Sequence, residues 1–188
     1  CYWYKRTLKI PETMKGRDIL LHFDAVDWET IVYINGVKVG RHTGGYDPFY
    51  FDITSALKGK EEHELVVYTY DNTGGEGQPK GKQALNKWGC GYTPVSGIWQ
   101  TVWLEPVNSI HIESLTIRPD VDNSCLKVSV SASLTTGVSV NINLLDKAGD
   151  KVAAIAGGKV GRILTLPIEN PHLWSVDDPY LYDLDITI

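Results

Sequence analysis

Apolar and polar side chains alternate along most of this 188-residue chain, and that period of two limits what it can fold into. Successive side chains of a β-strand point to opposite faces of a sheet, so an alternating run predicts a strand. The clearest case is segment 126–134, where aliphatic residues alternate with lysine and serine. No segment shows a convincing helical period. The sequence therefore predicts an all-β fold.

Shorter runs of the same kind, separated by turn residues, predict the other strands. Asn35-Gly36 lies between two of them and predicts a hairpin, because a type I′ turn needs positive φ at both central residues. One helical turn, capped by Thr54, is expected at Ser55–Lys58. The strands expected in addition to 126–134 are 2–10, 19–23, 28–34, 37–39, 49–53, 65–70, 97–104, 138–144, 164–168 and 182–188.

The segment Gly97–Leu104 carries large apolar side chains at both alternating sets of positions. It is therefore predicted to be a single central strand, buried on both faces. Pro94 lies before it and cannot donate to a ladder, so an irregular entry is expected. The tryptophans expected in the core are Trp3, Trp28, Trp103 and Trp174.

A change in composition after segment 105–108 predicts two domains, 1–107 and 108–188. The regular strand spacing of the second domain is typical of an immunoglobulin-like sandwich. The chain stops at Ile188 inside an expected strand, so that sandwich is expected to be incomplete. It also begins at Cys1 without an initiator Met or signal peptide, which suggests a fragment.

Charge and cysteine usage argue against several functions. The net charge is −5, and Lys80, Lys82 and Lys87 are too sparse for a nucleic-acid patch. No apolar run approaches the roughly 20 residues of a membrane span. The three cysteines lie far apart, without metal-ligand spacing or the pattern of a disulfide framework. We therefore expect no nucleic acid, membrane, metal or cofactor as a partner.

A long glycine-rich segment without periodicity, Asp71–Trp88, interrupts the strands of the first domain. Loops of this length in compact domains are usually functional or mobile. A second glycine-containing segment, Gly44–Pro48, is expected to form a tight turn.

Several short motifs, each weak alone, occur together over nearly the whole chain. Because the motifs occur in the same order as in that family, the chain resembles the N-terminal, non-catalytic part of family 2 glycoside hydrolases. This is the group of β-galactosidases, β-mannosidases and β-glucuronidases. The resemblance implies a jelly-roll sugar-binding domain, then an immunoglobulin-like sandwich, then a catalytic (β/α)8 barrel. The motifs are Trp3–Arg6, Leu21–Trp28, Val32–Gly40, Gly44–Phe49, Phe51–Thr54, Ser96–Leu104, Leu173–Ser175 and Pro179–Tyr182.

The resemblance places both catalytic glutamates on the barrel, which lies outside this sequence. A retaining glycosidase needs two carboxyl groups about 5–5.5 Å apart. Asp24, Asp27 and Glu29 are the nearest approach to an acidic cluster here, and they are interpreted as structural or solvated. We therefore assign no catalytic residue, expect this chain alone to be inactive, and expect the whole protein to be a retaining glycosidase.

In the family, the loop before the Gly-Ile strand reaches the barrel and can touch the terminal sugar. On this resemblance, Trp88 and Tyr92 are candidates for stacking on a sugar ring, and Gln83, Lys87 and Thr93 for hydrogen bonds to it. Packing of the two rings against the barrel is the alternative interpretation. Some relatives place an aspartate in this loop, whereas segment 87–94 carries no carboxylate.

Two other functions remain open from the sequence. One is an autonomous carbohydrate-binding or adhesion module, which predicts an aromatic platform on an exposed sheet face. The other is a complete small hydrolase, which requires two carboxylates in a cleft. Export to the periplasm or the exterior of a bacterium is the expected location, with the cytoplasm as the alternative.

Overall fold

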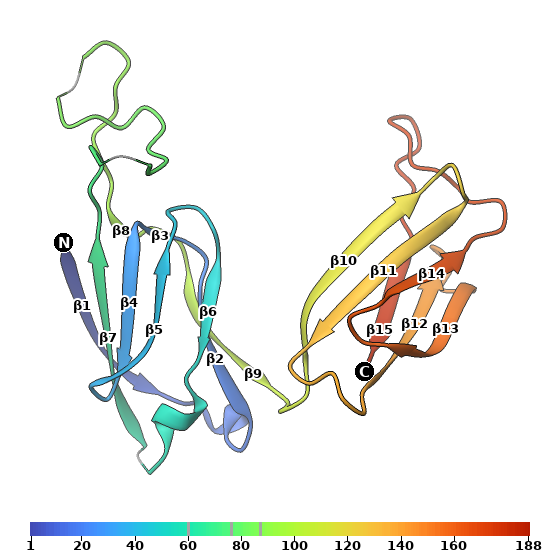
Figure 1. Ribbon diagram of the computed structural model, residues 1–188, viewed down its shortest axis with the longest axis horizontal. Helices are drawn as coiled ribbons and strands as arrows, with labels where there is room; N and C mark the ends of the chain where they lie inside the picture. Colours follow the sequence, from blue (N-terminus) through green and yellow to red (C-terminus); the bar gives the residue numbers. More distant parts are fainter. Residues whose placement is uncertain (60, 76, 87) are drawn as a thin grey trace. The chain divides into compact units, whose positions relative to one another are not determined.

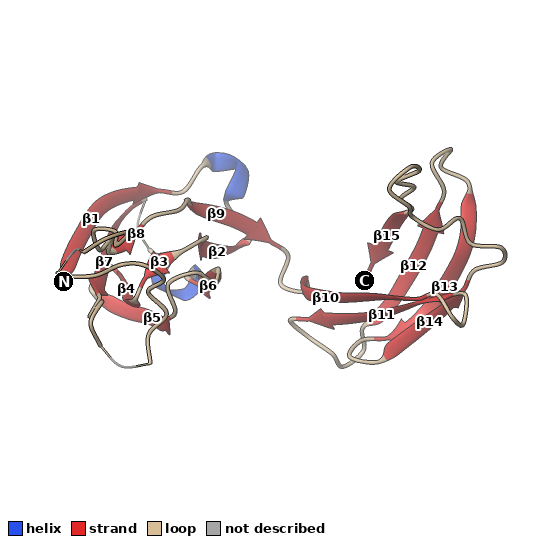
Figure 2. Ribbon diagram, turned by 90° about the horizontal axis from the view of Figure 1, so that it is seen from above, coloured by secondary structure: helices blue, strands red, loops and turns tan. Residues whose placement is uncertain are grey.

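The computed structural model describes residues 1–59, 61–75, 77–86 and 88–188, and its regular structure is almost entirely strand (Figures 1 and 2). The described helical turns are the 3-10 helices η1 (Glu12–Met14) and η2 (Thr54–Leu57). The predicted all-β fold is confirmed. The chain divides into two compact units, Cys1–Asn108 and Ser109–Ile188, here named unit 1 and unit 2.

The strands of unit 1 form three antiparallel sheets. Their orders are β1-β7-β4-β5, β6-β2-β9 and β3-β8. The bounds are β1 Tyr2–Lys9, β2 Asp18–Phe23, β3 Val26–Asp27, β4 Glu29–Ile34, β5 Val37–Thr43, β6 Phe49–Asp52, β7 Glu62–Tyr70, β8 Gly97–Ile98 and β9 Val102–Val107.

One hydrophobic core lies between the two larger sheets of unit 1. Leu21 and Phe23 of β2 share a buried cluster with Val32 and Ile34 of β4 and with Val67 of β7. Their alternation with outward-facing residues is what a two-layer sandwich requires. The expected jelly-roll sandwich is therefore confirmed.

The hairpin predicted at Asn35-Gly36 joins β4 to β5. Asn35 has φ 52° and Gly36 has φ 80°, as a type I′ turn requires. The return strand is longer than predicted, because its pairing with β4 continues through Gly40 to Thr43.

The predicted cap of the helical turn is wrong. Helix η2 begins at Thr54 itself, follows Ile53, and has no side-chain cap bond. The Thr54 hydroxyl instead accepts a hydrogen bond from the Ile19 amide at 2.9 Å. Thr54 therefore ties η2 to β2.

The predicted single buried strand at 97–104 is also wrong. β8 pairs with β3, whereas β9 pairs with β2 in a different sheet. Between them the chain leaves both ladders, and the amides of Trp99 and Gln100 turn toward the Ala25 carbonyl. Two apolar faces on one segment thus mark a crossing between sheets rather than one central strand.

Three of the four tryptophans expected in the core are exposed instead. Trp3, Trp103 and Trp174 are 64%, 42% and 59% exposed, and Trp28 is half-buried. In unit 1 the strand register explains this, because Trp3 and Trp103 alternate with the inward-facing residues of their strands. Smaller aliphatic side chains and Phe23 fill the interior.

Unit 2 is an immunoglobulin-like sandwich of two antiparallel sheets, ordered β10-β11-β14 and β13-β12-β15. Val128 and Val130 of one sheet and Val140 and Ile142 of the other share its core. Strands β10 and β13 were not predicted; each lies at a sheet edge, where alternation of burial is weak. The bounds are β10 Ile112–Asp120, β11 Cys125–Ala132, β12 Ser139–Leu145, β13 Lys151–Lys159, β14 Ile163–Pro167 and β15 Asp183–Thr187.

Candidate functional site

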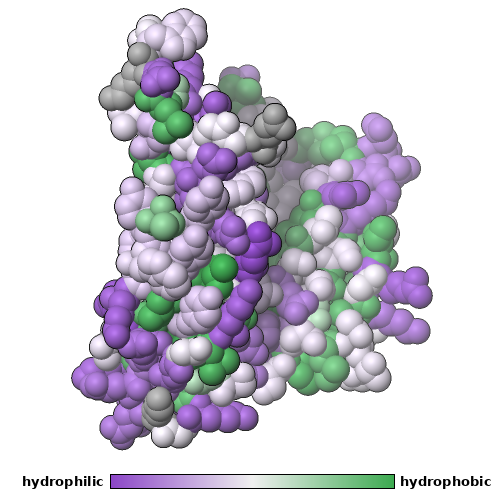
Figure 3. All heavy atoms as spheres, turned by 60° about the vertical axis from the view of Figure 1, so that its left-hand side comes forward, coloured by the Kyte–Doolittle hydropathy of each residue, from purple (hydrophilic) through white to green (hydrophobic). Residues whose placement is uncertain are grey.

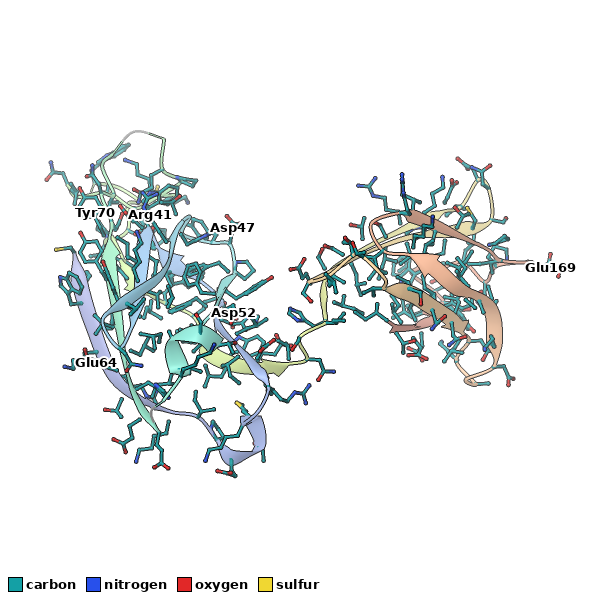
Figure 4. All side chains as sticks on the ribbon, turned by 60° about the horizontal axis from the view of Figure 1, so that its bottom comes forward. Arg41, Asp47, Asp52, Glu64, Tyr70 and Glu169 are labelled. Carbon is teal, nitrogen blue, oxygen red and sulfur yellow. The ribbon has the colours of Figure 1, made fainter. Side chains whose placement is uncertain are left out.

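The glycine-rich segment is the connection between β7 and β8, residues 71–96. It extends beyond the end of the unit 1 sandwich, past β3 and β8 (Figure 1). Tyr70 and Arg41 lie at the end of the sandwich from which this loop leaves (Figure 4). The loop is thus presented to the surroundings from a rigid sheet.

Asp71 anchors the base of this loop. Its carboxylate accepts hydrogen bonds from the side chains of Thr73, at 2.8 Å, Gln78 and Ser96, which lie at both ends of the loop. Burial raises the pKa of Asp71, but the three hydrogen bonds outweigh it and hold the pKa below its ordinary value. A charged Asp71 therefore closes the loop at its base.

Asp27 of β3 is a second carboxyl under the loop, and it is buried. It is 5% exposed, and its Oδ1 has no hydrogen-bond partner among the described residues. The Gln83 side chain of the loop interacts with this carboxyl. Burial, and then the nearby charge of Asp71, raise the pKa of Asp27 above its ordinary value. A Cβ on Gly45 would lie 2.8 Å from Oδ1, so this close approach requires glycine.

The Asp27→Asn variant is expected to gain stability relative to the native chain as the pH rises. A carboxyl with a raised folded-state pKa stabilises the fold fully below the unfolded value, near 3.8, and this stabilisation is lost as the pH rises through the folded pKa. The amide does not titrate. Thermal unfolding between about pH 4 and pH 7 measures the difference, with Asp52→Asn as the control at an exposed carboxyl. A difference independent of pH would contradict the buried charge.

The outer part of the loop is held by its own backbone. Gln83 and Tyr92 form an isolated β-bridge. The Tyr92 amide donates a hydrogen bond to the Lys82 carbonyl, and the Ala84 amide donates one to the Tyr92 carbonyl. These two bonds are 2.9 and 3.0 Å long. The Gly91 amide closes a turn onto the Trp88 carbonyl at 3.0 Å. The loop is therefore a folded lobe.

The five predicted sugar-binding residues have different places in this lobe. Trp88 and Tyr92 are 82% and 64% exposed, and Thr93 is exposed beside Tyr92. Gln83 is engaged internally: its Oε1 accepts a hydrogen bond from the Val95 amide at 2.6 Å, and its side chain interacts with Asp27. Lys87 lies outside the described residues.

Two further exposed rings lie at the β3–β8 end of unit 1, and neither was predicted as a site residue from the sequence. Tyr46 and Trp99 meet edge to face, with ring centroids 6.0 Å apart. The Trp99 indole donates to the Gly45 carbonyl at 2.8 Å, which fixes its orientation. The Gly44-Gly45 pair was the available signal, since such a turn allows close backbone approach.

The acidic residues of this site do not form a hydrolytic pair. Asp71 is occupied by three hydrogen bonds, and Asp27 is buried beneath the loop. Among the described residues, no group of three or more His, Cys, Asp or Glu side chains is placed to hold a metal ion. In the same residues we find no helix long and apolar enough to cross a membrane. The exposed groups are suited to contact rather than bond cleavage.

Solved structures and curated proteins resemble this chain over nearly its whole length. A β-galactosidase of Thermoanaerobacter pseudethanolicus is 28% identical over 99% of the chain, and one of Bacteroides ovatus is 30% identical over 97%. A β-glucuronidase of Ruminococcus gnavus, solved in complex with D-glucuronic acid, matches 99% of it with a TM-score of 0.73 and 26% identity. The chain spans only 26%, 22% and 33% of these three proteins.

Two family models divide the chain much as the strands do. Residues 1–100 match the model described as glycosyl hydrolase 2 galactose-binding domain-like, and residues 110–188 match glycosyl hydrolases family 2. The first model alone covers more than half of the chain, so the chain belongs to glycosyl hydrolase family 2.

Proposed function

We propose that this chain is the non-catalytic sugar-binding and scaffold portion of a family 2 glycosidase acting on a β-glycoside. Its β7–β8 loop would form one wall of a substrate pocket whose catalytic carboxylates lie on a (β/α)8 barrel. The observation that carries this proposal is the anchored loop, which extends beyond the end of the galactose-binding-like domain (Figure 1). Trp88 and Tyr92 are exposed on this loop.

The chemistry of the exposed loop residues suits a sugar. An indole or phenol ring offers a flat apolar face with a polar edge, which matches the C–H face and hydroxyl rim of a pyranose. Thr93 adds a hydroxyl that donates and accepts. Gln83 acts one step away, since it ties the lobe to Asp27 and to the Val95 amide. We therefore assign contact to Trp88, Tyr92 and Thr93 and positioning to Gln83.

The relatives support a shared pocket rather than a complete one. The proteins named β-galactosidase and β-glucuronidase match this chain over only 22% to 33% of their own length. Of the two carboxyls described under the loop, Asp71 accepts three hydrogen bonds and Asp27 is buried. The proposed partners are therefore carbohydrate and the catalytic barrel of the same protein.

In the full-length protein, Trp88→Ala and Tyr92→Ala are each expected to lower kcat/KM about tenfold, the loss of roughly 1.4 kcal/mol of contact. Initial rates on a small aryl glycoside measure this, with thermal unfolding to show that each variant is folded. Trp174→Ala, which removes another exposed tryptophan from unit 2, is the matched control. Unchanged kcat/KM in both loop variants would overturn the assignment of this loop to the pocket.

A further inference from the structure

Aromatic rings in mutual contact cover part of the outer face of the β1-β7-β4-β5 sheet. Trp3 of β1 lies 4.8 Å from Tyr68 of β7 and 6.5 Å from Tyr33 of β4, measured between ring centroids. Trp3 is 64% exposed although it is held on a strand. Large exposed apolar groups on a sheet face commonly mark an interaction site.

The strand register makes these rings one strip. Trp3 is paired with Tyr68. Tyr33 is paired with Val66, which lies two residues before Tyr68 and on the same face of the sheet. Tyr70, two residues after Tyr68, extends the face in the other direction, and it is 41% exposed. From residue 66 to residue 70 the strand advances about 13 Å. We name Trp3, Tyr33, Tyr68 and Tyr70 the aromatic strip.

The aromatic strip leads directly to the candidate site. Tyr70 is the last residue of β7 and is followed by Asp71, which closes the base of the loop. Figure 4 shows Tyr70 at the end of the sandwich from which the loop leaves. A ligand lying along the strip would therefore have one end near the proposed pocket wall.

The surroundings of the strip are charged but balanced. Arg41 Nε lies 2.6 Å from Glu29 Oε1, and Lys5 Nζ lies 2.5 Å from Glu64 Oε2. Each ion pair offers hydrogen-bond donors and acceptors without a net charge. The Arg41–Glu29 pair lies next to the strip, because Glu29 is the cross-strand neighbour of Tyr70. The side of unit 1 that bears β1 shows mainly residues of intermediate hydropathy among charged ones (Figure 3). This combination favours a neutral, polyhydroxylated ligand.

We propose that the aromatic strip binds a neutral oligosaccharide chain and guides it toward the β7–β8 loop. This inference rests on the proposed function and extends it, because it makes the substrate class a glycan chain rather than a small glycoside. The rings stack on successive sugar units, and the Arg41–Glu29 and Lys5–Glu64 pairs bond their hydroxyls. Because the rings are fixed on strands, little side-chain entropy is lost on binding.

The other large sheet of unit 1 provides a contrast. On β6-β2-β9 the rings of His22 and Trp103 stack on each other at 4.0 Å with an interplanar angle of 8°. The Trp103 indole donates to Asp24 at 2.9 Å, and His22 Nε2 lies 2.9 Å from Glu105. One face of each ring is thus covered by its neighbour. Trp103 is therefore an exposed tryptophan outside the strip and serves as a matched control.

The binding test uses the 188-residue chain and unbranched, neutral β-linked gluco-, xylo-, manno- and galacto-oligosaccharides of two to six units, titrated by calorimetry. We expect at least one series to bind, with affinity rising with length. Trp3→Ala should weaken that binding at least tenfold, Trp3→Tyr should retain most of it, and Trp103→Ala should leave it unchanged. Binding by none of the four series, or equal binding by Trp3→Ala, Tyr68→Ala and the native chain, would overturn the proposal.

A second measurement in the full-length protein separates this proposal from the function on which it rests. Trp3→Ala should raise KM for oligosaccharides and leave kcat/KM for a small aryl glycoside unchanged. Trp88→Ala should lower kcat/KM for both. Loss of oligosaccharide activity only in Trp3→Ala would uphold the strip and reject the loop pocket, whereas loss only in Trp88→Ala would uphold the pocket and reject the strip.

Discussion

Replacing Gly97 by alanine is expected to destabilise unit 1 by about 3 kcal/mol, the sum of backbone strain and a steric clash. Gly97 begins β8 with φ 95°, a conformation that L-residues rarely adopt. A Cβ there would lie 2.2 Å from the Tyr4 hydroxyl, which accepts a hydrogen bond from the Ile98 amide. The methyl group would displace the ring that connects β1 to β8, close to the base of the loop.

Chemical denaturation of the native chain and the variant measures this loss. Gly16→Ala is the matched control, because Gly16 has φ 79° but a methyl group added there would have no neighbour within 4 Å. It should show the backbone strain alone, about 1 kcal/mol. Equal losses of stability in the two variants would show that a methyl group added at position 97 does not clash with Tyr4.

The alternating pattern was sufficient to predict the fold class, because burial on one face leaves a direct trace in sequence. Val128 and Val130 alternate with hydrophilic residues, and all the strands predicted around such runs are present. The pattern failed where both faces carry bulky groups. At 97–104 it could not distinguish a buried strand from a chain that changes sheets, since only Gly97 and the irregular residues 99–101 mark the break.

Tryptophan burial was predicted poorly for a related reason. Size and apolarity favour the core, but the strand register decides which face a residue occupies. Trp3 precedes Tyr4, which packs against the core, so Trp3 must face outward. Its partners Tyr33 and Tyr68 come from distant segments, and the strip they form depends on pairings that one sequence does not reveal.

The sequence selected the β7–β8 loop as the candidate site but did not show how the loop is held. Length and glycine content were enough to select the loop, and the resemblance pointed to Trp88 and Tyr92. The anchoring carboxyls Asp27 and Asp71 were missed as a pair because they meet the loop only through tertiary hydrogen bonds. Gln83 was predicted to touch sugar, and its hydrogen bond with the Val95 amide and its interaction with Asp27 make positioning the better proposal.

Replacing Asp71 by alanine is expected to release the β7–β8 loop while the sandwich stays folded. The carboxylate accepts bonds from Thr73, Gln78 and Ser96, and Thr73 is itself buried. A hydrogen bond to a charged group contributes about 1.5–3 kcal/mol, and three on one group are not additive. We therefore expect the free energy of local loop opening to fall by about 3 kcal/mol.

The rate of amide hydrogen exchange in residues 72–96, compared with the rate for the β4 and β7 amides, measures this opening. Asp52→Ala is the control, because Asp52 accepts a hydrogen bond from the Thr54 amide elsewhere in unit 1.

The pH dependence of loop opening gives an independent check. The lowered pKa of Asp71 means that its stabilisation is present above the unfolded value of 3.8 and is lost as the pH falls through the folded pKa. The native loop should therefore loosen only in strong acid, whereas the loop of the Asp71→Ala variant should be open throughout. An acid-induced loosening that persists in the variant would show that a group other than Asp71 closes the base of the loop.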